Sequence, residues 1–252
     1  MIRKLFRTLF LVILGVGLGT IAYEAIMFGR IWLLRSNNPS STSLIDTRIR
    51  EAKAMGRQPR RVQAWLPLEK ISPNLQRAVL AGEDTNFFMH RGFDYEAIQK
   101  VFEQAQREAA RAAKAEGEND DWLPSLPEFR RGGSTISQQL AKNLYLSSQR
   151  SFFRKGQEAV LTFMMERALT KRRILEIYLN VIEWGDGIYG AEAAAQHYFR
   201  KPATALSANE AAYLSAMIPN PRTVFNPQVN PRRVARRQRI ILRGMQYVRL
   251  GA

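Results

Sequence analysis

Glu83 is a candidate for acid–base chemistry because it interrupts the apolar stripe of a predicted helix. It lies eight residues after Leu75 and four after Val79, so the three side chains share one helical face. Burial disfavours the charged form of a carboxylate and raises its pKa, as a general acid or base requires. The spacing therefore predicts a functional carboxylate. The alternative is a structural carboxylate paired with an arginine.

Glu158 is the second candidate, at the start of an apolar face that it shares with Thr162. Arg154 and Lys155 stand one turn earlier, where a helix brings side chains together. Two such carboxylates near basic residues predict groups that flank a polar reaction site. Two further glutamates are instead expected in exposed ion pairs with neighbouring basic residues: Glu166 and Glu176, paired with Arg167, Lys171 or Arg172.

The segment RRGGSTISQQLAKNLYL, Arg130–Leu146, combines glycines, hydroxyls and polar helical stripes. Thr135 and Gln138 have capping-box spacing, so a helix is predicted to begin near Ser134 or Thr135. Its first N–H groups have no partner within the helix and favour an anion. The polar stripes consist of Gln138 with Lys142 and of Gln139 with Asn143. A capped surface helix with a solvated face is the alternative.

The elements that position these residues are predicted to be helices. Helix starts are indicated at Ser72-Pro73, at Ser207 with Glu210, and at Asn230-Pro231. No long alternating strand and no internal repeat is found, so the fold class is all-α. One segment breaks the pattern, because an alanine-rich helical stretch at Ala105–Ala115 is followed by an acidic, proline-containing loop at Glu116–Phe129.

The amino-acid composition limits the classes of protein to which this chain can belong. The chain has 252 residues, 46% of them hydrophobic, which suffices for one core with an appendage. It has no cysteine, which excludes a disulfide framework and thiol-ligated metal. Its formal net charge of +16 indicates an anionic partner, which charge alone leaves open among nucleic acid, acidic lipid and phosphorylated substrate.

The N-terminal sequence predicts a membrane-spanning segment. Three basic residues precede an uncharged run at Leu9–Tyr23, and the segment from Leu5 to Leu34 is long enough to span a bilayer. A cleaved signal peptide is the rival, but no A-x-A-like site follows. We therefore expect a retained anchor with a cytoplasmic N-terminus. The predicted division is a tail at 1–8, a transmembrane anchor at 9–34, a basic juxtamembrane linker at 35–64 and the main domain at 65–252.

Five segments in unbroken order resemble the motifs of the peptidoglycan glycosyltransferases, which occur in bifunctional penicillin-binding proteins and as stand-alone enzymes. They are EDTNFFMHRGFD (Glu83–Asp94), GGSTISQQLAKN (Gly132–Asn143), RKGQEAVLTFMMER (Arg154–Arg167), RRILEIYLNVIEWGDGIYGAEAAAQHYF (Arg172–Phe199) and LSANEAAYLSAMIPNP (Leu206–Pro221). The resemblance covers about Trp65 to Pro227 and is closest to the monofunctional proteobacterial enzymes. No S-x-x-K occurs, so a transpeptidase domain is not expected.

The resemblance implies a lysozyme-like, two-lobed, helical domain that polymerises lipid II. The growing lipid-linked glycan would be transferred to the GlcNAc 4-hydroxyl of lipid II, with inversion and release of undecaprenyl diphosphate. It implies a single-pass protein of the inner membrane, with the catalytic domain in the periplasm and a role in cell wall biogenesis and cell shape. The expected partners are lipid II, lipid-linked glycan, the anionic membrane surface and cell-wall synthesis or division proteins, and no nucleic acid.

The resemblance also assigns residues. Glu83 would be the general base. Glu158 would be a second essential carboxylate, whose role as acid, metal ligand or orienter of cations stays open. Substrate contacts are expected from Asp84, Ser134, Thr135, Gln138, Gln139, Lys142, Asn143, Arg154 and Lys155. Residues expected to shape the cleft are Phe87, His90, Gly92, Tyr178, Asn180, Gly185, Gly187 and Gly190. A divalent cation, Mg or Mn, is a candidate cofactor with no ligands assigned.

Two rival functions are compatible with parts of the sequence. A hydrolytic lysozyme-like enzyme also uses carboxylates on a helical scaffold, but it needs neither a membrane anchor nor a cationic diphosphate site. A basic membrane-tethered binding protein would suit the C-terminal segment Pro231–Val248, although a basic helix on an anionic membrane is the simpler interpretation. An activity assay distinguishes the three functions. The glycosyltransferase would polymerise lipid II, the hydrolase would cleave finished glycan, and the binding protein would bind without reaction.

Overall fold

A computed structural model describes residues 2–97, 99, 103, 106–107, 134–147 and 151–251. The expected acidic loop at 116–129 lies outside the described residues, as do 130–133 and most of the expected helix at 105–115. In the described part the chain is mainly helical, which confirms the predicted all-α class and the single N-terminal apolar helix.

The helices follow one another around three very short strands. The α-helices are α1 (Ile2–Leu33), α2 (Ser43–Ala54), α3 (Pro73–Glu83), α5 (Ile136–Tyr145), α6 (Phe152–Ala168), α7 (Lys171–Val181), α8 (Ala191–Phe199), α9 (Ala208–Met217) and α10 (Pro231–Gly244). Short 3-10 turns lie at Leu68–Lys70, Ala203–Ala205 and Met245–Tyr247. The strands are β1 (Val62–Gln63), β2 (Glu183–Gly185) and β3 (Ile188–Tyr189), in the order β1-β3-β2, with β1 parallel and β2 antiparallel to β3.

The predicted helix starts are confirmed. Thr135 and Ser207 each form a complete capping box, with Gln138 and Glu210 as the returning side chains. The Ser72 hydroxyl accepts the N–H of Asn74 ahead of Pro73 at the first turn of α3. Because each cap satisfies N–H groups that the helix leaves unpaired, these residues fix where the helices begin.

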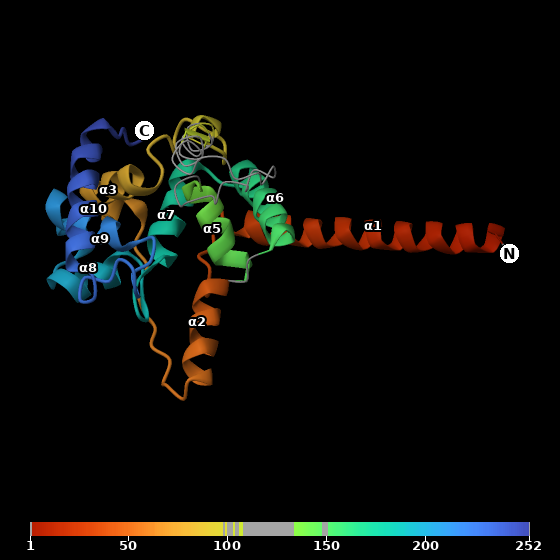
Figure 1. Cartoon of the computed structure of the whole chain (residues 1–252), viewed down its shortest axis with the longest axis horizontal. Coiled ribbons are helices and arrows are strands. Elements are labelled where there is room, and N and C mark those ends of the chain that lie inside the picture. The colour runs from red at the N-terminus through yellow and green to blue at the C-terminus, as the bar shows by residue number, and fades with distance from the viewer. Residues whose placement is uncertain are drawn as a thin grey trace, which may run out of the picture.

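Helix α7 connects two groups of helices. Figure 1 shows α3, α8, α9 and α10 gathered on one side of α7, and α5 and α6 on the other. The α7 side chains Tyr178, Leu179 and Asn180 are fully buried, and Trp184 follows them in the same core. The candidate residues of α3 and α5 therefore meet over a helix that is packed on several sides.

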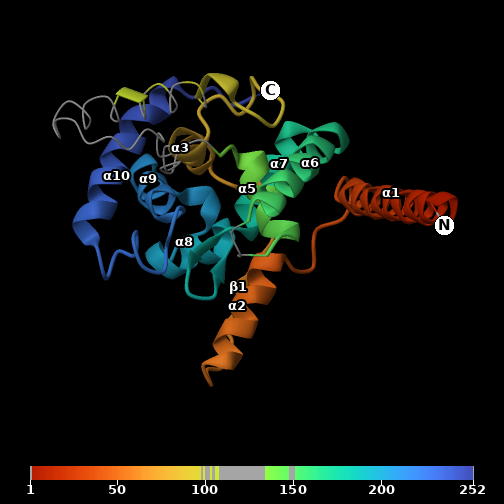
Figure 2. The same ribbon diagram turned by 45° about the vertical axis from the view of Figure 1, so that its right-hand side comes forward.

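Helix α1 leaves this body as one long rod in both views (Figures 1 and 2). Residues 6–33 are long and apolar enough to cross a membrane, by length and composition. The end of α1 differs from the exposed part of the helix, because Met27, Ile31 and the following Leu34 are buried against the rest of the chain. The Arg173 guanidinium also donates to the Leu34 carbonyl oxygen at 2.8 Å. The C-terminal end of the apolar helix is thus part of the folded core.

Helix α2 belongs to the folded body as well. Its Ile45 side chain is fully buried, and Arg48 donates across the structure to Glu183. Helix α2 lies within the predicted basic juxtamembrane linker at 35–64. It packs one side against α5 and the region of β2, so this part of the linker is not simply solvated.

The connection at β2 and β3 depends on glycine. Gly187 and Gly190 have φ values of +71° and +83°, which side chains with a Cβ rarely adopt. A Cβ on Gly190 would also lie 2.7 Å from the Asn180 carbonyl oxygen. This tight hairpin returns the chain from Glu183 into α8.

Shortening the chain tests whether α1 is part of the core. A chain that starts at Ala25 keeps Met27, Ile31 and Leu34, whereas one that starts at Arg35 loses all three. Each buried apolar side chain of this size contributes about 1.5–3 kcal/mol. The shorter chain should therefore melt at a clearly lower temperature in the same detergent, measured by circular dichroism. Equal melting temperatures would show that α1 is only an appendage.

Candidate active site

Glu83 ends helix α3 with both carboxylate oxygens bonded. Oε1 accepts from the Arg237 guanidinium at 2.8 Å, and Oε2 accepts from the Gln139 side-chain amide at 2.9 Å. The Gln139 amide oxygen in turn accepts the Tyr178 hydroxyl at 2.9 Å. The Glu83 side chain is only 7% exposed, so its predicted burial is confirmed.

Arg237 is a site residue that the sequence analysis missed. The basic C-terminal segment was expected to lie on the membrane surface, but in α10 Val234 and Ile241 are buried and Arg237 reaches Glu83. The available signal was spacing, since Arg237 lies three residues after Val234 and four before Ile241, on the buried stripe. Gly82 permits the approach of α10, because an added Cβ there would lie 3.1 Å from Ile241.

Opposing effects act on the pKa of Glu83. Burial raises the pKa of the carboxyl above its ordinary value, while Arg237, Gln139 and, more weakly, Lys142 lower it. The net direction is upward. A carboxylate with a raised pKa is a stronger proton acceptor, and the neighbouring guanidinium still favours its ionised form. These are the properties of a general base.

The polar residues of helix α5 have two roles, since one forms the helix cap and others line a cavity. Gln138 is buried, and its side-chain oxygen accepts the N–H of Thr135 in the capping box. The expectation that Gln138 contacts substrate therefore finds no support in the geometry. Gln139, Lys142 and Asn143 of the same helix line a cavity.

Glu158 lies among cations. Its Oε2 accepts from Arg154 at 3.0 Å and its Oε1 pairs with Lys155. The Glu158 side chain is 4% exposed, whereas Lys155 is 52% exposed. Burial lowers the pKa of Lys142, and the charge of Glu158 opposes that effect. Glu158 thus balances a cluster of three cations, which is consistent with orienting them.

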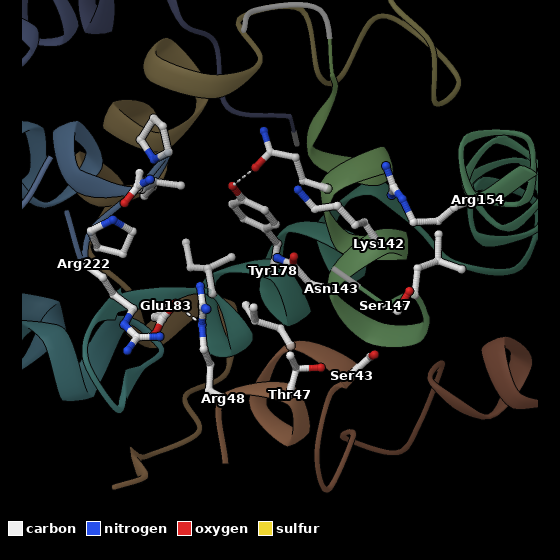
Figure 3. Close-up of a pocket in the computed structure, with 18 residues that line it drawn as sticks. Ser43, Thr47, Arg48, Lys142, Asn143, Ser147, Arg154, Tyr178, Glu183 and Arg222 are labelled. Atoms are coloured by element: carbon white, nitrogen blue, oxygen red, sulfur yellow. Dashed lines mark hydrogen bonds and ion pairs between the residues drawn. The ribbon is translucent and has the colours of Figure 1, made fainter. Parts of the chain in front are cut away.

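The cavity has a volume of about 370 Å³ and reaches across five segments of the chain (Figure 3). Lys142 and Arg154 lie on one side of it, and Arg48, Glu183 and Arg222 lie on the other. The remaining lining comes from α2, α5, α7 and the loop after α9. These residues are Ser43, Leu44, Thr47, Gln139, Asn143, Leu146, Ser147, Tyr178, Ile182, Ile218, Pro219, Asn220 and Pro221.

A second cavity of about 260 Å³ contains Glu83 itself, with Asp84, Ser134 and Thr135 in its walls. Gln139 connects the two cavities, because it lines the first and donates to Glu83 in the second. A hydroxyl bound in the second cavity could give its proton to Glu83, while an anionic leaving group is stabilised by cations of the first. The arrangement suits displacement of a phosphorylated group.

Asp84, His90 and Asp94 form the metal-competent cluster of the described residues, with ligand atoms within 4.8 Å of one another. His90 Nε2 contacts Asp84 Oδ1 at 2.9 Å, and the other Asp84 oxygen accepts the N–H of Ile136. His90 Nδ1 accepts the N–H of Gly92, so a neutral ring with Nε2 protonated fits these bonds. The bonds fit a structural corner between α3 and α5, and a cation would have to replace the His90–Asp84 bond.

Other expected cleft residues have packing roles. Phe87 is fully buried, and Gly92 has φ +93° with Thr162 2.9 Å from an added Cβ. Asn180 bonds to the backbone N–H and carbonyl of Leu66. An added Cβ on Gly185 would lie 2.9 Å from the Tyr198 hydroxyl. These residues hold the walls of the site in place.

The prediction that Glu166 and Glu176 are exposed is wrong. Their side chains are 8% and 17% exposed. Glu166 pairs with Lys171 at 2.7 Å and with the Ser137 hydroxyl, while Glu176 pairs with Arg173. Both glutamates link neighbouring helical segments, and neither lines the two cavities described above.

Comparisons with known proteins agree with the sequence resemblance. A family model described as Transglycosylase matches residues 50–246. A protein of Laribacter hongkongensis named biosynthetic peptidoglycan transglycosylase is 44% identical over 226 residues, which cover 90% of this chain and 91% of the relative. One of the same name from Chromobacterium violaceum is 42% identical over 97% of this chain and 99% of its own. Another from Thiobacillus denitrificans is 46% identical over 81% and 80%.

Replacing Arg237 tests its effect on Glu83. Arg237→Gln removes a positive charge that favours the ionised carboxylate, so the pKa of Glu83 should rise further above its ordinary value. Carbon-13 NMR of labelled glutamate side chains measures the titration, and Glu83→Gln identifies the signal. Arg236→Gln, on the exposed face of α10, is the control for the loss of one charge. Equal pKa shifts in both variants would contradict the direct pair.

Proposed function

The chain belongs to the transglycosylase family and is a peptidoglycan glycosyltransferase, and from this premise we propose that it polymerises lipid II by inverting displacement. The acceptor would be the GlcNAc 4-hydroxyl of lipid II, and the donor would be the growing glycan on undecaprenyl diphosphate. Cell wall biosynthesis is the process that such an enzyme serves.

One observation carries the proposal: a buried base and a cationic cavity are joined by Gln139. Glu83 accepts from the amide nitrogen of Gln139, and Gln139 and Lys142 line the larger cavity on consecutive turns of α5. The charge of Glu83 acts on the pKa of Lys142, so the two groups are electrostatically close. The proposal therefore uses a base and a diphosphate site in two cavities that Gln139 connects.

The proposed step balances as a displacement at C1 of the donor MurNAc. The acceptor oxygen forms a bond to C1 as the bond from C1 to the phosphate oxygen breaks. The hydroxyl proton passes to Glu83, and the bonding electrons leave with the diphosphate. Lys142 and Arg154 neutralise the charge that develops on the leaving group, where charge-assisted hydrogen bonds are strong.

Inversion requires the attacking and leaving groups to lie on opposite faces of the donor sugar. In inverting glycosidases the two carboxylates are about 6.5–9.5 Å apart, with a water between them. Glu83 and Glu158 bond to different partners. A bound acceptor sugar could occupy the space beside Glu83. Glu158 acts in this proposal as the residue that orients Arg154 and Lys155.

The apolar helix α1 supports a membrane location for this reaction. We propose a single-pass protein of the inner membrane, with the N-terminus in the cytoplasm and the catalytic domain in the periplasm. Lipid-linked glycan and lipid II would then be held by the same membrane as the enzyme. Partners in cell-wall synthesis or division, an effect on cell shape and contact with anionic lipid remain part of this proposal.

A divalent cation is an optional component of the proposal. Asp84 and Asp94 offer carboxylate oxygens of the kind that Mg or Mn prefers, whereas the His90 imidazole suits other transition metals better, and the set is already internally bonded. The neutralising charges assigned above belong to Lys142 and Arg154. Initial polymerisation rates with and without a chelator test whether a cation is required.

Replacing Glu83 tests the general base. Glu83→Gln keeps the shape but cannot accept the proton, so polymerisation should fall to background while lipid II binding stays largely intact. Gel analysis of glycan from purified lipid II measures the first, and equilibrium binding in the same detergent measures the second. Glu69→Gln, at an exposed carboxylate outside both cavities, is the matched control. Polymerisation by Glu83→Gln at the control's rate would refute the assignment.

The cationic cavity can be tested in parallel. Lys142→Ala and Arg154→Ala should each lower turnover by about 10²–10³-fold, the size expected for one preorganised charge-stabilising donor. Lys201→Ala, which removes an exposed lysine paired with Glu210, should leave turnover unchanged. Melting temperatures check that each variant folds. Turnover near that of the Lys201 variant would show that the diphosphate binds elsewhere.

A further inference from the structure

The larger cavity has two chemically different ends. Lys142 and Arg154 mark one end, and the second end is formed by Arg48, Glu183 and Arg222 (Figure 3). The proposed function uses only the first end. The second end lies on helix α2, strand β2 and the loop after α9, which are far apart in the sequence.

The second end is unsuited to another phosphate, because its two guanidinium groups face an excess of carboxylates. Arg48 bonds to Glu183 at 3.1 Å and to Glu51 at 2.9 Å. Arg222 bonds to Glu51 at 3.4 Å and to Asp186 at 3.2 Å. Two guanidinium groups thus meet three carboxylates. Such a surface offers donors and acceptors to an uncharged ligand, as a sugar requires.

Glu183 supplies an unused acceptor at this end. Its side chain is 5% exposed, and Oε2 accepts from the Arg48 Nε. Oε1 is buried and has no hydrogen-bond partner among the described residues. A buried carboxylate oxygen without a donor is costly, and an arriving hydroxyl or N–H can satisfy it. Burial also raises the pKa of the Glu183 carboxyl, against the opposing charges of Arg48 and Arg222.

Helix α2 adds further polar groups beside this pair. Ser43 and Thr47 line the same cavity from α2, and in Figure 3 Thr47 lies between Arg48 and Ser43. Hydroxyls can donate and accept, so they suit sugar hydroxyls and N-acetyl groups. The segment that follows the apolar helix therefore forms a wall of the cavity.

We propose that Arg48 and Glu183 form a sugar-binding subsite, so that α2 helps to hold the lipid-linked glycan. The inference rests on the proposed function, in which the diphosphate occupies the end at Lys142. A donor held there by its diphosphate would extend its sugars through the cavity towards α2. The ligand groups are the hydroxyl and N-acetyl groups of an N-acetylhexosamine chain, bound by hydrogen bonds rather than by net charge.

The test measures polymerisation kinetics with a lipid-linked tetrasaccharide diphosphate as donor and lipid II as acceptor. Arg48→Gln should raise the KM for this donor about tenfold, the effect of losing one hydrogen bond to a charged group. The kcat should stay within about twofold, because the reacting groups are untouched. Lys53→Gln removes the same charge from the exposed face of α2 and should change neither constant.

A second variant separates binding from folding. Arg48→Gln leaves Glu183 buried without its partner, which could destabilise the protein. The double variant Arg48→Gln/Glu183→Gln places two amides that can bond to each other, and it should still raise the KM while its melting temperature returns towards that of the unchanged chain. An unchanged KM in folded variants, a loss of kcat alone, or a KM that rises only when the melting temperature falls would overturn the subsite.

The same experiment distinguishes failure of the subsite from failure of the function. If the unchanged chain does not polymerise lipid II, the proposed function fails. If it polymerises lipid II and the Arg48 variants keep its KM, only the subsite fails and the reaction assignment stands.

Discussion

The site depends on one buried carboxylate that is held between a charged and a neutral donor. Arg237 fixes one oxygen of Glu83 at 2.8 Å and Gln139 fixes the other at 2.9 Å. Burial without these partners would favour protonation, and a protonated carboxyl cannot accept a proton. The bonds from Arg237 and Gln139 therefore favour the ionised form of the buried Glu83, which the proposed role as a base requires.

Several distant elements are arranged around this carboxylate. Helix α3 ends at Glu83, α5 brings Gln139, and α7 brings Tyr178 to support Gln139. Helix α10 crosses close to α3 at Gly82 and delivers Arg237. Because the four helices pack in one core, a change in any of them acts on Glu83 through contacts rather than through chain connectivity.

The sequence predicted the features that depend on neighbouring residues, namely the helix starts and the buried faces of helices. Capping residues at Thr135 and Ser207 fixed helix starts, and the stripe that contains Glu83 predicted its burial. Long-range partners were not predictable in this way. The pairing of Arg237 with Glu83 joins residues 154 positions apart, and that of Arg48 with Glu183 joins residues 135 positions apart. Helical spacing identifies a buried face but does not state which carboxylate a charged side chain on that face will meet.

The stereochemistry of the product tests the central claim most directly. Purified chain would be given lipid II labelled with carbon-13 at the reacting C1, and the new glycosidic bond would be read from its one-bond carbon–proton coupling. A base on one side of the donor sugar and diphosphate cations on the other predict a polymer with β linkages formed from an α-linked donor, with release of undecaprenyl diphosphate. A polymer with α linkages, or free disaccharide in place of polymer, would contradict the account.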